Sequence, residues 1–229
     1  MRCIVTAGPT AEPLDQVRRL TNFSTGRLGS GLVNFLSGRG HEVTLLIGQQ
    51  ATWRGERRAR LIETFTTTAD LRQRLAALAK LPVDAVFHAA AVSDFAFGRA
   101  WRRTPAGELS EIGAGKISSR LGVVLAELVP TPKIIAELRG WFHQARLVGW
   151  KYEVDGDRLG VIQLAEKQLA QCLTDACVAN GPAYGAGFGL VRRDAKPLHL
   201  ADARALFLAL EQVMGGGAVT SAQAPLAAC

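Results

Sequence analysis

The stretch RCIVTAGPT, residues 2–10, joins an apolar run to a sharp turn and decides the fold that we expect. A short run of apolar residues bounded by turn residues predicts a buried strand, here over residues 2–7. The glycine and proline that follow turn the chain at the carboxyl end of this strand, and ligands of doubly wound sheets bind at that edge. Gly8 is therefore a candidate phosphate-binding residue, with an ordinary turn as the alternative.

Similar apolar runs recur along the chain and alternate with segments of helical spacing. We expect further strands at residues 42–47, 60–65, 83–89, 145–150 and 174–179. We expect helices at residues 28–38, 68–80, 131–139, 159–172 and 201–214. The third helix opens with Thr-Pro-Lys, a cap followed by proline at the first helical position. This alternation predicts an α/β fold with a doubly wound, mostly parallel, Rossmann-like sheet and helices on both faces.

Two segments interrupt the alternation. Residues 95–130 are rich in glycine and arginine and show no clear periodicity, which is typical of a functional flap or a partner-binding excursion. Residues 186–200 predict two short strands around RRDAKP, so the fold includes a small β excursion. We expect a single nucleotide-binding domain over residues 1–214 and a disordered tail over residues 215–229.

Composition narrows the class of protein. The 229-residue chain is 48% hydrophobic and contains no run of 18 apolar residues, so we expect a soluble, unprocessed protein that does not enter membranes. Its four cysteines form no CxxC or zinc pattern, which favours a reduced, cytoplasmic protein. The net charge is +7, and arginines gather at residues 54–60 and 98–103. We favour a solvated surface there over a phosphate-collecting rim, and both over a nucleic-acid surface.

The glycine-rich stretch LTNFSTGRLGSG, residues 20–31, precedes and enters the first expected helix. Free backbone N–H groups and the helix dipole at such a position can bind an anion. The candidates for this cradle are Ser24, Thr25, Gly26 and Gly29. A nicotinamide-dependent reductase would use similar glycines, but it would place them directly after the first strand and would end the second strand with an acidic residue or arginine. The second strand ends in IGQQ instead.

Three further stretches bring polar groups toward the same sheet edge. In HAAAVSDF, residues 88–95, the alanines allow a ligand to approach the backbone, and Asp94 is a candidate for ribose or Mg²⁺; the alternative is a packed strand followed by a turn. His88 fits a packed strand histidine better than a catalyst. Lys116, in GAGKISSR, is a candidate phosphate ligand or a solvated charge. Trp150 and Lys151 close the fifth strand.

Five motifs in order resemble the phosphopantothenoylcysteine synthetase family of coenzyme A biosynthesis. They are VTAGPTAEPLDQVRRLTNFSTGRLG, HAAAVSDF, KISS, VGWKYEVDG and LTDACVAN, and together they span roughly residues 2–200. The resemblance implies a ligase that joins 4′-phosphopantothenate to L-cysteine. It implies activation of the acid as an acyl-nucleotidylate by ATP or CTP with Mg²⁺, and release of pyrophosphate.

The details of the motifs are closer to the ATP-using branch than to the CTP-using branch. The sequences NFSTGRLG and WKYE are similar to the ATP-using enzymes. In the CTP-using enzymes KIKK stands in place of KISS, and two more lysines stand at the positions of Gln168 and Cys172. The resemblance therefore favours ATP.

The resemblance also implies roles for single residues. Asn22 would bind the acyl carbonyl, Ala90 and Ala91 would lie against the acyl group, and Asp94 would hold ribose or metal. The other implied ligands of the nucleotide or its phosphates are Gly8, Ser24, Thr25, Gly26, Gly29, Lys116, Trp150, Lys151 and Asn180. Arg18 and Arg19 stand where the family has an arginine at a subunit contact, which implies a homodimer whose partner completes each site.

The sequence also departs from the family pattern. DFAFGRAW lacks the proline that commonly follows this aspartate, and KISS carries less charge than KIKK. A paralogue that binds nucleotide without catalysis therefore stays open as an alternative, as does an NAD(P)-dependent reductase. Nucleic acid is the least favoured partner.

Overall fold

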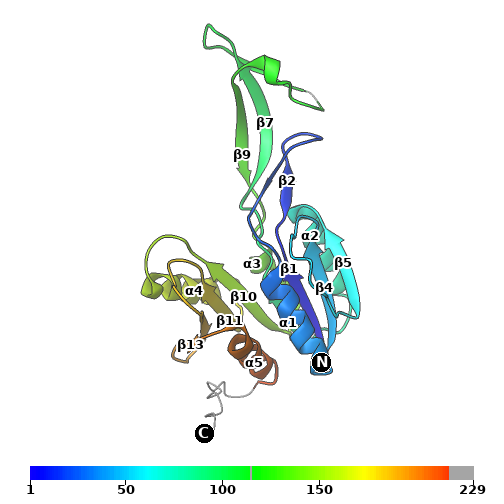
Figure 1. Cartoon of the computed structure of the whole chain (residues 1–229), viewed down its shortest axis with the longest axis vertical. Helices are drawn as coiled ribbons and strands as arrows, with labels where there is room; N and C mark the ends of the chain where they lie inside the picture. Colours follow the sequence, from blue (N-terminus) through cyan, green and yellow to red (C-terminus); the bar gives the residue numbers. More distant parts are fainter. Residues whose placement is uncertain (114, 217–229) are drawn as a thin grey trace.

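The computed structural model describes residues 1–113 and 115–216, and its body is an eight-stranded sheet with helices on both faces (Figure 1). Across the sheet the strands follow the order β13 (Leu198–Leu200), β12 (Phe188–Arg192), β11 (Ala176–Asn180), β10 (Arg146–Tyr152), β6 (Ala85–His88), β1 (Arg2–Ala7), β4 (Glu42–Gly48) and β5 (Leu61–Phe65). The six strands from β11 to β5 are parallel, while β12 and β13 add an antiparallel hairpin at one edge. The predicted fold class and strands are confirmed.

Helices cover both faces of the sheet, because alternate strand residues are apolar on each face and need to be buried. They are α1 (Arg27–Gly38), α2 (Thr68–Leu78), α3 (Ile134–Trp141), α4 (Arg158–Cys172) and α5 (Ala203–Met214). Alternate residues of a strand point to opposite faces. Val5 packs in the core beneath α1 and α5, whereas Ile4 packs in the core beneath α2 and α3. Helix α4 packs on β11 through Val161 and Cys177.

The predicted start of α3 is wrong by three residues. Thr131 is not the cap, because its N–H donates to the Asp94 carbonyl at 2.9 Å and its hydroxyl donates to the Ser93 carbonyl at 2.5 Å. Lys133 takes the cap position instead, and the helix runs to Trp141. The Thr-Pro pair thus fastens the chain to the segment after β6 rather than opening a helix.

Residues 95–113 and 115–130 form an arm that projects from the body (Figure 1). It contains β7 (Phe95–Arg103), β8 (Leu109–Glu111), a single 3₁₀ turn (Ser119–Leu121) and β9 (Val124–Pro130), in an antiparallel sheet of order β8–β7–β9. Few of its side chains are buried, so it carries no hydrophobic alternation that a sequence pattern could reveal. The strands of the arm were not predicted, whereas the small β excursion predicted within residues 186–200 is confirmed as β12 and β13.

A short hairpin that the sequence did not predict meets this arm. It consists of β2 (Ala11–Pro13) and β3 (Arg19–Thr21), and its tip contacts the arm around Lys116. The Asp15 carboxylate accepts from the Ile117 N–H at 3.0 Å and from the Arg18 guanidinium at 2.5 Å. Arg18 first and the Ile117 N–H second hold the pKa of Asp15 well below its usual range, so this carboxylate is ionised.

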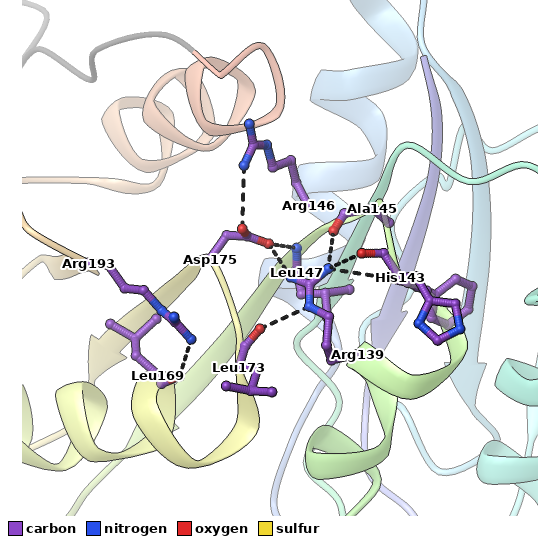
Figure 2. Close-up of polar contacts among 10 residues, drawn as sticks. Arg139, His143, Ala145, Arg146, Leu147, Leu169, Leu173, Asp175 and Arg193 are labelled. Carbon is purple, nitrogen blue, oxygen red and sulfur yellow. Dashed lines mark hydrogen bonds and ion pairs between the residues drawn. The ribbon is translucent and has the colours of Figure 1, made fainter.

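At the end of the sheet where β10 and β11 begin, Arg139 and Asp175 form a hydrogen-bonded arginine clasp (Figure 2). Asp175 accepts from the Leu147 N–H and from the Arg139 guanidinium, both at 2.7 Å. Arg139 also donates to the carbonyls of Phe142, His143, Ala145 and Leu173. The aspartate of the LTDACVAN motif is therefore a fold-stabilising residue that joins α3, α4 and β10.

Three other predictions can be compared with the described residues. Within residues 1–113 and 115–216, no helix has the length and hydropathy that crossing a bilayer demands. Cys3, Cys172 and Cys177 are free thiols, and Cys229 lies outside the described residues. Of the tail predicted over residues 215–229, only the first two glycines are described.

Candidate functional site

The carboxyl ends of β1 and β6 form the centre of the candidate site. After β1 the chain passes through the β2–β3 hairpin to α1 on one face, and after β6 it passes through the arm to α3 on the other face. Such a switch point leaves a crevice between the two departing chains. The Ala91 N–H donates to the Gly8 carbonyl at 3.0 Å, so the turn after β1 and the alanines after β6 form the floor of one site.

The glycine-rich stretch enters this site as the start of α1. Gly26 caps the helix with φ of 77°, a left-handed conformation that favours glycine. A Cβ on Gly29 would lie 2.6 Å from the Ala7 Cβ, so only glycine lets α1 begin this close to β1. Thr25 and half-buried Ser24 precede the cap, and the first turn, RLGS, carries no acidic side chain. The Arg27 N–H donates to the Thr25 hydroxyl at 3.3 Å, and the helix dipole gives this end of α1 a positive partial charge.

Asn22 and the alanine pair, far apart in sequence, meet in the crevice. The Asn22 Nδ2 group donates to the Ala91 carbonyl at 3.2 Å, and that carbonyl also accepts from the Thr10 N–H at 3.2 Å. The Asn22 side chain is exposed. One hydrogen atom of its amide is thus held, while its oxygen and second hydrogen have no partner among the described residues and can contact a ligand.

Trp150 and Asn180 lie on the same sheet face as the start of α1. Each follows by two positions a residue of the core beneath α1 and α5, Val148 and Val178 respectively. The Trp150 Nε1 and Asn180 Oδ1 atoms are buried and have no hydrogen-bond partner in the part of the chain that the structure describes. A buried polar atom without a partner costs about 1–3 kcal/mol, so this pair fits a site that a polar ligand completes. Neighbouring Lys151 pairs with Glu153 at 2.9 Å.

Asp94 and Lys116 stand apart from this cluster. The Asp94 carboxylate is 66% exposed and pairs with Lys133. No group of three acidic, histidine or cysteine side chains suited to a metal exists among residues 1–113 and 115–216. Mg²⁺ is commonly held by one or two carboxylates together with substrate phosphates, so Asp94 fits such a site only with ligands from a nucleotide. Lys116 is exposed in the arm, next to the tip of the β2–β3 hairpin.

Sequence reasoning missed Arg57, which it left within a solvated arginine cluster. The Arg57 Nε atom donates to the Ser30 hydroxyl in the first turn of α1 at 3.2 Å, and Nη2 donates to the Trp53 carbonyl at 2.6 Å. Within the described residues Arg57 has no carboxylate partner, whereas neighbouring Arg58 pairs with Glu56 at 2.7 Å. Nothing in RGERRAR distinguishes the two arginines, because only the tertiary structure brings one of them to the helix start.

His88 is a packed strand residue, as expected. It is 6% exposed, its Nδ1 atom lies 3.0 Å from the Thr6 hydroxyl, and burial lowers its pKa to about 4. The imidazole is therefore neutral near pH 7, as suits a packed side chain.

These features define a doubly wound α/β protein whose candidate ligand site lies at the switch point between β1 and β6. Residues 1–205 match the DNA/pantothenate metabolism flavoprotein C-terminal domain, and the chain belongs to this family. The family that the five sequence motifs indicated is therefore confirmed.

Known proteins support this assignment. The chain is 34% identical over 179 residues to the coenzyme A biosynthesis bifunctional protein CoaBC of Thermococcus kodakarensis, covering 78% of this chain and 41% of that protein. It thus spans about two fifths of the length of that relative. The crystal structure of the DNA/pantothenate metabolism flavoprotein from Streptococcus pneumoniae matches with a TM-score of 0.78 and 27% identity, covering 94% of this chain and 99% of that one. A Cab2 mutant in complex with phosphopantothenate-cysteine shares the fold, with a TM-score of 0.70, 19% identity and coverage of 94% and 85%.

Proposed function

We propose that this protein is a ligase that joins 4′-phosphopantothenate to L-cysteine through an acyl-nucleotidylate and releases pyrophosphate. One observation carries the proposal: the Asn22 amide is held against the Ala91 carbonyl beside the open start of α1. An amide aimed at an acyl group and an anion-binding helix start are the two parts that carboxylate activation needs. Family membership and the phosphopantothenate-cysteine complex of a structural relative agree with this chemistry.

The first step converts the substrate carboxylate into an acyl-nucleotidylate, because a free carboxylate has no good leaving group. A carboxylate oxygen attacks the α-phosphorus of the nucleotide, and the bond to pyrophosphate breaks. Gly8, Ser24, Thr25, Gly26 and Gly29 would surround the phosphates, and Arg57 and Lys116 would add cations. Mg²⁺, held by Asp94 and the phosphates, would neutralise negative charge as the pyrophosphate leaves. Trp150, Lys151 and Asn180 would flank base and ribose, with ATP favoured over CTP.

The second step forms the amide. The cysteine nitrogen attacks the acyl carbon, the carbon–oxygen bond to the nucleotide breaks, and the nitrogen loses a proton. Negative charge develops on the carbonyl oxygen, and the free Asn22 N–H would donate to it. Ala90 and Ala91 would let the acyl group lie against the backbone. Asn22 suits this role because its amide does not ionise.

The arm would take part through a second copy of the chain. Phe95, Leu128 and Val129 are exposed apolar residues of the arm, so residues 95–130 offer a surface for a homodimer contact or a flap. Arg18 and Arg19 at the β2–β3 hairpin would lie near that contact. Residues 1–214 would act as one nucleotide-binding domain of a cytoplasmic enzyme.

The test is pyrophosphate release with 4′-phosphopantothenate, L-cysteine, Mg²⁺ and either ATP or CTP. Each nucleotide is supplied separately, and we expect pyrophosphate release to be faster with ATP than with CTP. No release with either nucleotide rejects the ligase and leaves a non-catalytic paralogue. Asn22→Asp should consume nucleotide and accumulate the acyl-nucleotidylate, whereas Lys116→Gln should slow the activation step. Lys80→Gln, an exposed lysine after α2, is the matched control and should match the wild type.

A further inference from the structure

A buried side-chain pair lies directly beneath the alanine segment of the crevice. Thr6 of β1 and His88 of β6 are register partners, with side chains on the α2 and α3 face of the sheet. Thr6 is 0% exposed and His88 is 6% exposed. Their contact, Thr6 Oγ1 to His88 Nδ1, measures 3.0 Å. The pair ends the β1–β6 ladder at the point where the chain enters the crevice.

The Thr6 hydroxyl lies between two partners. The Ala90 N–H donates to Thr6 Oγ1 at 3.1 Å, so the hydroxyl oxygen is an acceptor. A hydroxyl has one hydrogen and two lone pairs, so its contact with His88 Nδ1 forms with either tautomer of the neutral ring. Burial keeps the ring neutral, because it lowers the pKa of His88 to about 4.

This pair fixes the peptide that orients Asn22. Past β6, the Ala89 N–H donates to the Thr6 carbonyl and the Ala91 N–H donates to the Gly8 carbonyl. Between them, the Ala90 N–H has the Thr6 hydroxyl as its acceptor instead of a backbone carbonyl. The Ala91 carbonyl then accepts from Asn22 Nδ2. A continuous path of contacts thus runs from His88 through the Thr6 hydroxyl to the Ala90 N–H. It continues along the backbone to the Ala91 carbonyl, which accepts from the Asn22 amide.

We propose that Thr6 and His88 are positioning residues for amide formation: they fix the Ala90 peptide and so aim the Asn22 amide at the reacting carbonyl. This inference rests on the proposed ligase activity. His88 holds the Thr6 hydroxyl where its oxygen accepts from the Ala90 N–H, and neither side chain touches substrate. The pair therefore affects the step that uses Asn22 and leaves nucleotide binding unaffected.

Thr6→Val tests the pair, because valine has the shape of threonine and removes only the hydroxyl. It should slow amide formation about tenfold, which corresponds to ~1.4 kcal/mol, leave the KM for ATP unchanged and accumulate acyl-nucleotidylate. Thr6→Ser should restore most of the rate. His88→Gln, which keeps an acceptor for the hydroxyl, should retain more rate than His88→Leu. Combined with Asn22→Ala, Thr6→Val should cause no further loss, since both act on one step.

Thr174→Val is the matched control. Thr174 is 1% exposed and lies just before β11, at the end of the sheet opposite to the candidate site. Its hydroxyl has no hydrogen-bond partner among the described residues. The control should keep the wild-type rate. The proposal is overturned if Thr6→Val also keeps that rate, if its KM for ATP rises as much as its kcat falls, or if its loss adds fully to that of Asn22→Ala.

A spectroscopic measurement separates this inference from the proposed function. The side-chain amide resonances of Asn22 should shift in ¹⁵N-labelled Thr6→Val and stay in place in Thr174→Val, without any substrate present. Unchanged Asn22 resonances in Thr6→Val refute the positioning role. A wild-type protein that releases no pyrophosphate refutes the ligase, while the resonances still decide whether the pair orients Asn22.

Discussion

Acidification should destabilise the protein through His88. An unfolded histidine becomes protonated as the pH falls through its ordinary pKa of 6.5, whereas the buried His88 stays neutral until the pH approaches its lowered pKa of about 4. The unfolded state therefore binds more protons in this window, and the free energy of unfolding falls as the pH falls. The pKa difference of about 2.5 corresponds to about 3 kcal/mol at ~1.36 kcal/mol per unit. That is a large part of the roughly 5–15 kcal/mol that stabilises an ordinary domain.

The assay is urea unfolding of the wild type and of His88→Gln at several pH values from about 7 to about 4. Other titrating groups are common to both proteins, so the difference between the two free energies isolates His88. The wild type should lose about 3 kcal/mol relative to His88→Gln, with most of the loss falling between the ordinary pKa of histidine and about pH 4. His143→Gln removes an exposed histidine and should stay parallel to the wild type throughout.

Parallel curves for the wild type and His88→Gln would refute this reasoning. They would mean that His88 is as easily protonated when folded as when unfolded, and that the Thr6 hydroxyl does not depend on a neutral ring. A loss above about pH 7.5 would equally contradict the argument, since histidine is neutral in both states there.

Three further predictions concern other contacts. Arg57→Gln should weaken the binding of inorganic tripolyphosphate about tenfold, as measured by titration calorimetry, because a charged hydrogen-bond donor at the start of α1 is lost. Arg58→Gln should bind like the wild type, and equal weakening in both variants would show only a general charge effect. Asp15→Asn should speed hydrogen exchange at the Ile117 amide, since the ionised acceptor is lost, and an unchanged rate would show that this contact does not hold the arm. Arg139→Met should lower the free energy of unfolding by about 3 kcal/mol in urea, because several carbonyls lose a charged donor, and a loss below about 1 kcal/mol would contradict the clasp.

Several candidate site residues could be named from the sequence because the signal for each is local. A strand that ends in Gly8 and a glycine-rich stretch before a helix carry that information in their own neighbourhood. Asn22 was singled out by the family motifs, yet its contact with Ala91 spans 69 positions and could not be read from either motif. Arg57 could not be separated from the arginines around it, because its partner Ser30 lies in a different element.

The sequence by itself predicted the succession of strands and helices along the chain, a mostly parallel sheet and the end of that sheet where we propose that ligands bind. Hydrophobic periodicity and turn residues act over a few positions, so each element carries its own signal. Only the tertiary structure decided which polar groups meet, because crossover connections place β6 beside β1 and bring the arm to the β2–β3 hairpin. The pairing of Thr6 with His88 and of Asn22 with Ala91 depends on that strand order, which no local pattern encodes.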